Sequence, residues 1–283
     1  MNYCFEVWKT MYEKDFNRNQ FLYHYTNVSK AFKILYGKKL KFSKLNLMND
    51  TLEAKPKLSF DKHVDSTTFQ KIVQHFGYTN NNYLQLLCMS EDSNVEMKAD
   101  NDRIKFSDYS GRGFALPRMW AQYADNNNGV CFIFDKSKLT SVIKKALGAE
   151  LIGMGKVDYI SHFKSFDIDL ISVVEHVKKL GTKSELVRNI NEVDFLKKYE
   201  NFVRYNYFSK LDDWKGENEF RFLAYGDQDN YIDNIFESIA GVVVGESIED
   251  SNLKIIELLC ENQFEIMKIS FNCDGCILTN IDE

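Results

Sequence analysis

Residues 21–43 read FLYHYTNVSKAFKILYGKKLKFS and contain a complete structural unit. The aromatic run at 21–25 is typical of a strand, because aromatic and β-branched side chains suit a pleated, half-buried surface. A helix is predicted next, with an N-cap residue, an apolar stripe and a closing glycine: Thr26 or Asn27, then Ala31, Phe32 and Leu35, then Gly37. Leu40 and Phe42 begin a second strand. The order strand, helix, strand places His24 where the chain is about to leave a sheet.

Beyond residue 43, helix and strand patterns follow one another without regular alternation, which favours an α+β fold over a doubly wound sheet. We expect residues 1–20 to form an N-terminal capping helix and residues 21–283 a single α+β domain. Within that domain, residues 136–207 are predicted to be a helix-rich insertion. Further strands are predicted at 83–90, 130–134, 220–225, 239–244 and 264–271, and a long polar loop at 91–118.

Composition indicates an ordinary globular protein, with 44% hydrophobic and 27% charged residues among 283. The net charge of −5 gives no general attraction to nucleic acid. The first residues are too charged for a secretory signal, and no apolar run is long enough to span a bilayer. We therefore expect a cytoplasmic protein without a membrane partner, whose 6 cysteines are reduced thiols. The pair Cys273 and Cys276 is predicted to flank a turn at Asp274–Gly275, a zinc half-site and a redox pair being weaker alternatives.

Three short clusters combine aromatic rings with hydrogen-bonding or ionisable groups. They are Tyr23-His24-Tyr25-Thr26, Met119-Trp120-Ala121-Gln122-Tyr123, and Trp214-Lys215-Gly216-Glu217-Asn218-Glu219-Phe220-Arg221. Flat apolar area with a few convergent polar groups is the usual composition of a small-molecule pocket. The clusters therefore predict a site for a planar ligand. No phosphate-binding glycine loop, dinucleotide fingerprint or His-Glu-x-x-His zinc helix occurs in the sequence.

The order of these clusters, together with the motifs at 45–50, 87–90, 129–134 and 242–245, resembles a widespread bacterial family catalogued as a domain of unknown function. The resemblance runs from about residue 21 to about residue 271.

A second resemblance implies a specific enzymatic reaction. The start of the chain is similar to bacterial ADP-ribosyltransferases of the toxin and abortive-infection kinds, although the middle motif of that superfamily has no clear counterpart here. The resemblance implies a mainly antiparallel sheet core and NAD as the substrate. It also implies that an early histidine holds a ribose, that an aromatic residue stacks on nicotinamide, and that a late glutamate is catalytic. The residues that match are His24, Tyr25, Thr26, Trp120, Tyr123 and Arg221 for binding NAD, and Glu219 with His24 and Glu217 for catalysis.

Strand alternation would point Glu217, Glu219 and Arg221 to one side. Glu219 would stabilise the positive charge that develops on the ribose when the nicotinamide bond breaks, and Glu217 would activate the acceptor. Arg221 would keep Glu219 ionised or grip pyrophosphate. The acceptor is expected to be a nucleic acid or a protein, and the biological setting a toxin or phage-defence system with its own partner.

Each assignment has a structural alternative. His24 can be a satisfied core histidine, Trp120 and Tyr123 can be core packing, and the two glutamates with Arg221 can be an ion-pair ladder. Two other functions remain open: a metal-dependent nuclease built from Asp50, Glu53, Glu217 and Glu219, and a silent ligand-sensing module. The sequence assigns no role to the other histidines, which are His63, His75, His162 and His176.

Overall fold

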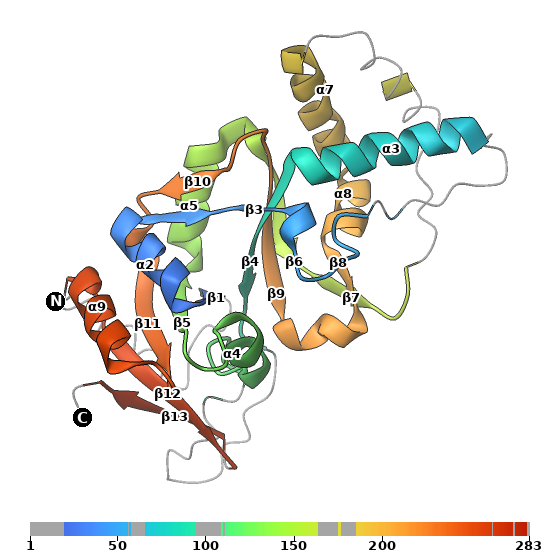
Figure 1. The fold of residues 1–283 in the computed structure, drawn as a ribbon. Helices are drawn as coiled ribbons and strands as arrows, with labels where there is room; N and C mark the ends of the chain where they lie inside the picture. The colour runs from blue at the N-terminus through green and yellow to red at the C-terminus, as the bar shows by residue number, and fades with distance from the viewer. Residues whose placement is uncertain are drawn as a thin grey trace.

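The computed structural model describes residues 20–55, 57, 66–93, 109, 111–163, 175–176, 185–261, 263–273 and 275–281. Its centre is a nine-stranded open sheet of order β13-β12-β11-β5-β1-β4-β9-β6, with β3 paired to β4 (Figure 1). Neighbouring strands in this sheet are antiparallel except β11 and β12. The predicted mixed, mainly antiparallel core is confirmed. The expected capping helix at 1–20 lies outside the described residues except for its last position, and so do most of the loop at 91–118 and His63.

The strands of the main sheet are β1 (Phe21–Thr26), β3 (Ser43–Lys44), β4 (Leu84–Ser90), β5 (Val130–Asp135), β6 (Leu151–Lys156), β9 (Glu219–Tyr225), β11 (Ile239–Gly245), β12 (Ile266–Asn272) and β13 (Gly275–Asn280). Two small ribbons add β2 (Lys39–Lys41) with β10 (Tyr231–Asp233), and β7 (Asp158–Ile160) with β8 (Ser209–Leu211). The helices that cover the sheet are α2 (Val28–Gly37), α3 (Ser66–Asn82), α4 (Pro117–Tyr123), α5 (Lys136–Leu147), α7 (Glu185–Lys198), α8 (Glu200–Tyr207) and α9 (Asp250–Cys260).

The unit predicted from residues 21–43 is present as β1, α2 and β2. Asn27 is the N-cap of α2, and its side chain accepts a hydrogen bond from the backbone N–H of Lys30 at 2.9 Å. The helix ends at Gly37, and Lys38 takes the left-handed conformation that lets the chain turn into β2. Ala31, Ile34 and Leu35 are buried on the face toward the sheet.

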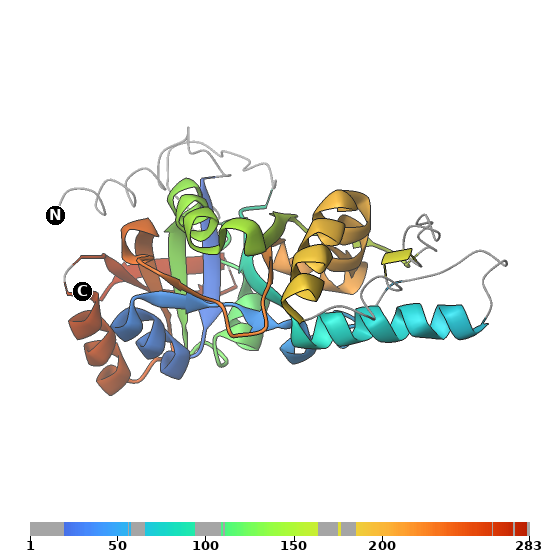
Figure 2. The same ribbon diagram turned by 90° about the horizontal axis from the view of Figure 1, so that it is seen from above.

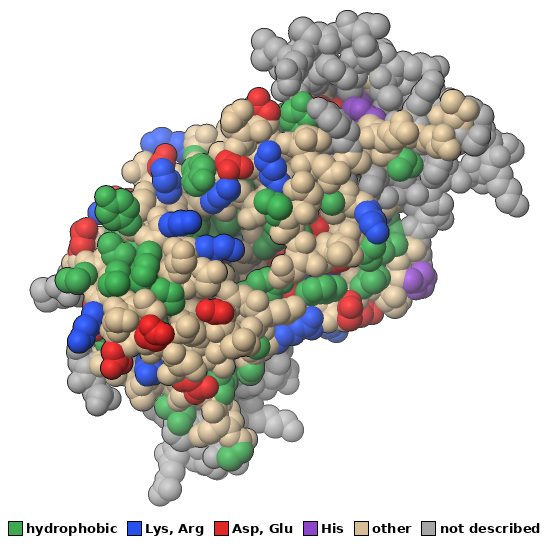
Figure 3. Space-filling view, in the orientation of Figure 1, with side chains coloured by type: hydrophobic (Ala, Val, Ile, Leu, Met, Phe, Trp, Pro, Cys, Tyr) green, Lys and Arg blue, Asp and Glu red, His purple; other side chains and the backbone are tan. Residues whose placement is uncertain are grey.

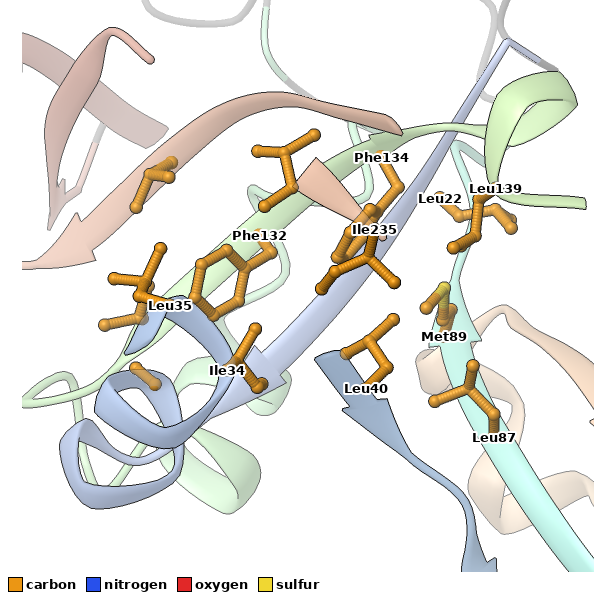
Figure 4. Close-up of a cluster of buried hydrophobic side chains, with 14 of the residues drawn as sticks. Leu22, Ile34, Leu35, Leu40, Leu87, Met89, Phe132, Phe134, Leu139 and Ile235 are labelled. Atoms are coloured by element: carbon orange, nitrogen blue, oxygen red, sulfur yellow. The ribbon is translucent and has the colours of Figure 1, made fainter. Parts of the chain in front are cut away.

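Two layers of side chains enclose the sheet. On one face, α2, α5, α9 and the β2–β10 ribbon pack over alternate residues of the central strands, and Figure 4 shows part of this cluster. On the other face, α4 packs against β1, β5 and β11, while α3, α7 and α8 pack against β4 and β9. Figure 2 shows α3 and α7 together at one end of the molecule, away from α9 and β13. This arrangement leaves β1 and β4 in the interior of the sheet, with β5 and β9 as their outer neighbours.

The end of the chain forms a parallel pair and a hairpin. Helix α9 connects β11 to the parallel strand β12, and β13 then turns back antiparallel to β12, with Asn272 opposite Gly275. The turn predicted near Cys273 and Cys276 is confirmed by this pairing. Strand β13 itself was not predicted from the sequence, because its mixed polar and apolar residues at 277–280 give no clear periodicity.

The described part of residues 136–207 includes helices α5, α7 and α8 and also strands β6 and β7. Helix α5 buries Leu139, Ile143 and Leu147 in the cluster under α2, and β6 forms the edge of the main sheet beside β9. The segment therefore contributes to the central body at both points, and its treatment as an insertion stays a prediction. Among the described residues, no helix combines the length and the apolar character needed to cross a bilayer.

Candidate functional site

A buried ionic cluster lies at the start of β9. Glu219 and Arg221 are two residues apart in this strand and project from the same face, as predicted. Glu217 reaches the cluster differently from the prediction, because it ends a short 3-10 helix at Asp212–Glu217 and is not part of the strand. Asn218 adopts a left-handed conformation with φ 44° between the two glutamates. The backbone reversal at Asn218, and not strand alternation, brings Glu217 beside Glu219.

Arg221 is fully buried and bridges two carboxylates. Its Nε and Nη2 donate to the two oxygens of Glu219, each at 2.9 Å. Its Nη1 donates to Oε2 of Glu53 at 2.9 Å and to the backbone carbonyl of Tyr207 at 2.7 Å, and its Nη2 also bonds Glu53. The guanidinium therefore has no donor directed at a ligand, and its role here is to hold Glu219.

Lys210 joins the remaining carboxylate to the cluster. Its Nζ lies 2.7 Å from Oε2 of Glu217 and 3.3 Å from Oε2 of Glu219. The other oxygen of Glu217 accepts a hydrogen bond of 2.6 Å from the hydroxyl of Tyr123. The Trp214 ring lies over the same ammonium at 4.4 Å and near the Arg118 guanidinium at 5.3 Å. Lys210 thus connects the buried acids to a half-buried indole at the surface.

The electrostatics of the cluster keep Glu219 ionised. Burial would raise the pKa of this carboxyl group, but the charges of Arg221 and Lys210 outweigh burial and lower the pKa to about 2. Burial alone would lower the pKa of Lys210, yet Glu219 and Glu217 raise it above its usual value. At neutral pH Glu219 is therefore ionised beside two charged cations, Lys210 and Arg221, and all three side chains are buried.

His24 leaves the sheet on the face opposite to Glu219. Tyr23 pairs with Ser90, and Ser90 pairs with Glu219, so these three residues share one face and the next residue along β1 takes the other. The ring of His24 lies with Nδ1 at 3.3 Å from the carbonyl oxygen of Cys88. A carbonyl oxygen only accepts hydrogen bonds, so Nδ1 carries the proton and Nε2 is left as an acceptor. Burial lowers the pKa of His24 to about 4, so the ring is neutral at physiological pH.

Cys88 lies between His24 on one face of the sheet and Glu219 on the other. Strands β1 and β4 bury each of their residues except His24 in one and Cys88 in the other. The two strands pair at one position, Tyr23 with Ser90, and the His24 to Cys88 contact lies just beyond it. The Cys88 thiol hydrogen-bonds Glu219, and burial with this negative charge raises the thiol pKa well above its usual value. Cys88 is therefore a protonated S–H donor, a role that sequence reasoning missed because the residue lies in an otherwise apolar strand motif.

Figure 3 shows the surface hollowed where Figure 1 draws β4. His24 and Cys88 are each half-buried, whereas the other residues of β1 and β4 are buried.

Three of the predicted binding residues lie in the core. Trp120 is fully buried, donates from Nε1 to the carbonyl of Phe114 at 2.7 Å, and packs edge-on against Tyr25 at 5.3 Å. The Tyr25 hydroxyl donates to the carbonyl of Gly113 at 2.6 Å. Thr26 is 3% exposed at the end of β1. The structure therefore joins Tyr123 to the acidic cluster and keeps Trp120, Tyr25 and Thr26 away from a ligand surface.

The acids of the nuclease hypothesis are only partly grouped. Glu53, Glu217 and Glu219 converge, but each is bonded to Arg221 or Lys210. Asp50 caps a turn by accepting from the backbone N–H of Leu52 at 2.9 Å. A magnesium ion would have to displace the protein's own cations, so the arrangement does not favour a nuclease centre.

The model of a family described as "Protein of unknown function (DUF2971)" matches residues 119–222. The match begins at the Met-Trp-x-x-Tyr motif and ends one residue after Arg221, so it contains the partners Tyr123, Lys210, Glu217 and Glu219. The expected likeness to a family of unknown function is confirmed over this stretch. No curated protein and no solved structure matches the chain.

Proposed function

We propose that the chain is an enzyme that breaks the glycosidic bond between ribose and nicotinamide in NAD and transfers the ADP-ribosyl group. The observation that carries the proposal is the buried Glu219 carboxylate, which Arg221 and Lys210 hold ionised and which contacts the thiol of Cys88, the residue whose carbonyl oxygen contacts His24. His24 and Glu219 project from opposite faces of the sheet, so the proposal requires that β1 and β4 separate beyond their single paired position for one ribose to reach both. The resemblance of the early strand, helix, strand unit to ADP-ribosyltransferases supports the same assignment.

Glu219 is suited to the transition state of this reaction. Glycosidic cleavage builds positive charge on the ribose ring, and a fixed carboxylate beside the ring stabilises that charge. Arg221 and Lys210 keep the Glu219 carboxylate ionised far below neutral pH. The cations also fix its orientation, so the carboxylate needs no rearrangement at the moment of reaction.

His24 is suited to binding the sugar. Its Nε2 is an acceptor, which can receive a hydrogen bond from a ribose hydroxyl. A ring that stays neutral down to a pH of about 4 keeps this acceptor across the physiological range. Glu217, held by Lys210 and Tyr123, is the candidate base for the incoming acceptor of the ADP-ribosyl group.

The surface next to the cluster offers contacts for the rest of a dinucleotide. Arg118 is exposed, and its guanidinium lies near the half-buried ring of Trp214. A guanidinium binds phosphate oxygens in a bidentate manner, and an indole ring presents a flat face to a base. In this proposal Arg118 replaces Arg221 as the pyrophosphate contact, and Trp214 replaces the buried Trp120 as the stacking ring. The acceptor is a nucleic acid or a protein, in a toxin or phage-defence setting.

The test is release of nicotinamide from NAD by purified protein, measured by chromatography with candidate protein and nucleic-acid acceptors. We expect His24→Ala and Glu219→Gln each to reduce release by about 100-fold or more. The matched control is Glu91→Gln, because Glu91 is also a buried carboxylate held by two lysines, and its ion pairs are with Lys136 and Lys156 and not with Lys210 or Arg221. The melting temperature of each variant is measured to test whether the fold is retained.

Four outcomes decide between the functions. Turnover that both site variants abolish and the control retains supports the transferase. A rise in melting temperature with NAD but no turnover supports a sensing module. Cleavage of nucleic acid that stops in chelator supports the nuclease, and full activity in Glu219→Gln would contradict the transferase.

A further inference from the structure

Two histidines and a glutamate converge at the end of the molecule that is formed by α3 and α7. His75 lies in α3, Glu192 in α7, and His176 in a separate stretch at 175–176. Nε2 of His75 lies 3.2 Å from Oε2 of Glu192, and Nε2 of His176 lies 2.9 Å from the same oxygen. Sequence reasoning gave these histidines no role, since 117 residues separate His75 from Glu192.

From this geometry we propose that His75, His176 and Glu192 bind a divalent transition metal of the zinc class. One donor atom from each residue lies within 4.8 Å of the others. Donors bound to zinc at about 2.0–2.2 Å in a tetrahedron are separated by about 3.3–3.6 Å. The observed separations from the carboxylate are close to that spacing, so small side-chain rotations allow all three atoms to bind one ion.

The surroundings orient the two imidazoles. The ring of His176 stacks on Phe195 with centroids 4.1 Å apart and planes at 18°. The ring of His75 packs edge-on against Phe76 at 5.2 Å. Fixed rings reduce the entropy that is lost when a metal binds, so the site is largely formed before the ion arrives.

The exposure of the ligands indicates an open site. The Glu192 side chain is 3% exposed, whereas the His75 and His176 side chains are 17% and 12% exposed. Solvent therefore reaches the histidine side, where water can occupy the fourth position. Two histidines, one glutamate and one water are a ligand set typical of catalytic zinc, in contrast to closed structural sites with four protein ligands. The rival explanation is a hydrogen-bonded His-Glu-His group that needs no metal.

The experiment measures zinc binding by the full chain. Protein stripped with chelator and dialysed is titrated with Zn²⁺ in a calorimeter, and bound zinc is then counted by mass spectrometry. We expect one zinc per chain and a higher melting temperature. His75→Ala and His176→Ala should each weaken binding by more than about 100-fold, because each removes one of three ligands. Glu192→Gln should weaken it as well, since it removes the only negative charge among the ligands.

The matched control is His162→Ala, since His162 is exposed and its ring contacts Ser161, away from this site. Because a ligand substitution can disturb the fold, the apo forms of all variants are compared by circular dichroism. Co²⁺ is bound in parallel, and its visible spectrum reports tetrahedral nitrogen and oxygen ligands. Zinc uptake well below one per chain, or uptake by folded His75→Ala and His176→Ala equal to that of wild type, would overturn the proposal and leave the hydrogen-bonded group.

Discussion

At the scale of single residues, Arg221 shows how a charge is accommodated in the interior. Its guanidinium has no exposed surface, and its five donors are directed at Glu219, Glu53 and the carbonyl of Tyr207. A buried charge costs several kcal/mol unless it is paired and hydrogen-bonded, so the arginine and its acids are mutually dependent.

Replacement of Arg221 by methionine is expected to lower the free energy of unfolding by about 3–5 kcal/mol, because Glu53 and Glu219 would remain buried with one cation fewer. Urea unfolding followed by fluorescence measures the change. Arg221→Lys is the conservative comparison, and it should recover only part of the loss, since an ammonium cannot reproduce the two-pronged contact with Glu219. A loss below about 1 kcal/mol in Arg221→Met would show that the cluster is not an energetic unit.

The lowered pKa of His24 predicts how the stability of the fold depends on pH. Its pKa is about 4 in the folded chain and about 6.5 when unfolded, so the unfolded state binds more protons between these values. The free energy of unfolding should therefore fall as the pH decreases from about 6.5 to about 4, by up to about 3 kcal/mol from this residue. Unfolding of wild type and His24→Gln compared at pH 5 and pH 7 isolates the effect. Equal pH dependence in the two proteins would contradict the burial of a neutral ring.

At the scale of elements, the segment that joins α4 to β5 lies close to the end of β11. A Cβ atom on Gly245, at the end of β11, would lie 2.0 Å from the carbonyl oxygen of Asn127. The backbone N–H of Gly245 also donates to the carbonyl of Gly129 at 3.0 Å. Glycine at this position thus permits β11 to end against the turn that follows α4.

Gly245→Ala is expected to destabilise the fold by about 1–3 kcal/mol, because backbone atoms must move to admit the methyl group. Gly77→Ala is the matched control. Position 77 is in α3, nothing lies within 4 Å of its added Cβ, and alanine should stabilise the helix by about 0.5–1 kcal/mol. Thermal unfolding of both variants tests whether Gly245→Ala lowers the stability and Gly77→Ala raises it.

The elements themselves were largely predictable from local pattern. Strand β1, the Asn27 cap and helix α2 follow from a short aromatic run, one polar side chain and one apolar stripe. The site was less predictable, because its convergence depends on backbone geometry that sequence does not display. Glu217 reaches Glu219 through the left-handed Asn218, Lys210 arrives from a separate strand, and Trp120 turns into the core to satisfy its N–H.

At the scale of the whole molecule, the sheet has an uneven distribution of pairing. Strands β5 and β1 pair along six positions, from Phe21 with Asp135 to Thr26 with Val130, whereas β1 and β4 pair at one. Amide hydrogens in continuous ladders exchange slowly, and those beside an interrupted ladder exchange sooner. We expect slow exchange across β1 and β5, and faster exchange for β4 amides that face β1. Hydrogen exchange read by mass spectrometry tests this, and uniform protection of β4 would contradict it.

The single paired position also divides the sheet into two arrays of strands, one from β13 to β1 and the other from β4 to β6. A ligand bound between the two arrays would add contacts between them that backbone hydrogen bonds do not provide there. The two arrays would then unfold together when the ligand is bound, so the width of the thermal unfolding transition, and not only its midpoint, would report ligand binding.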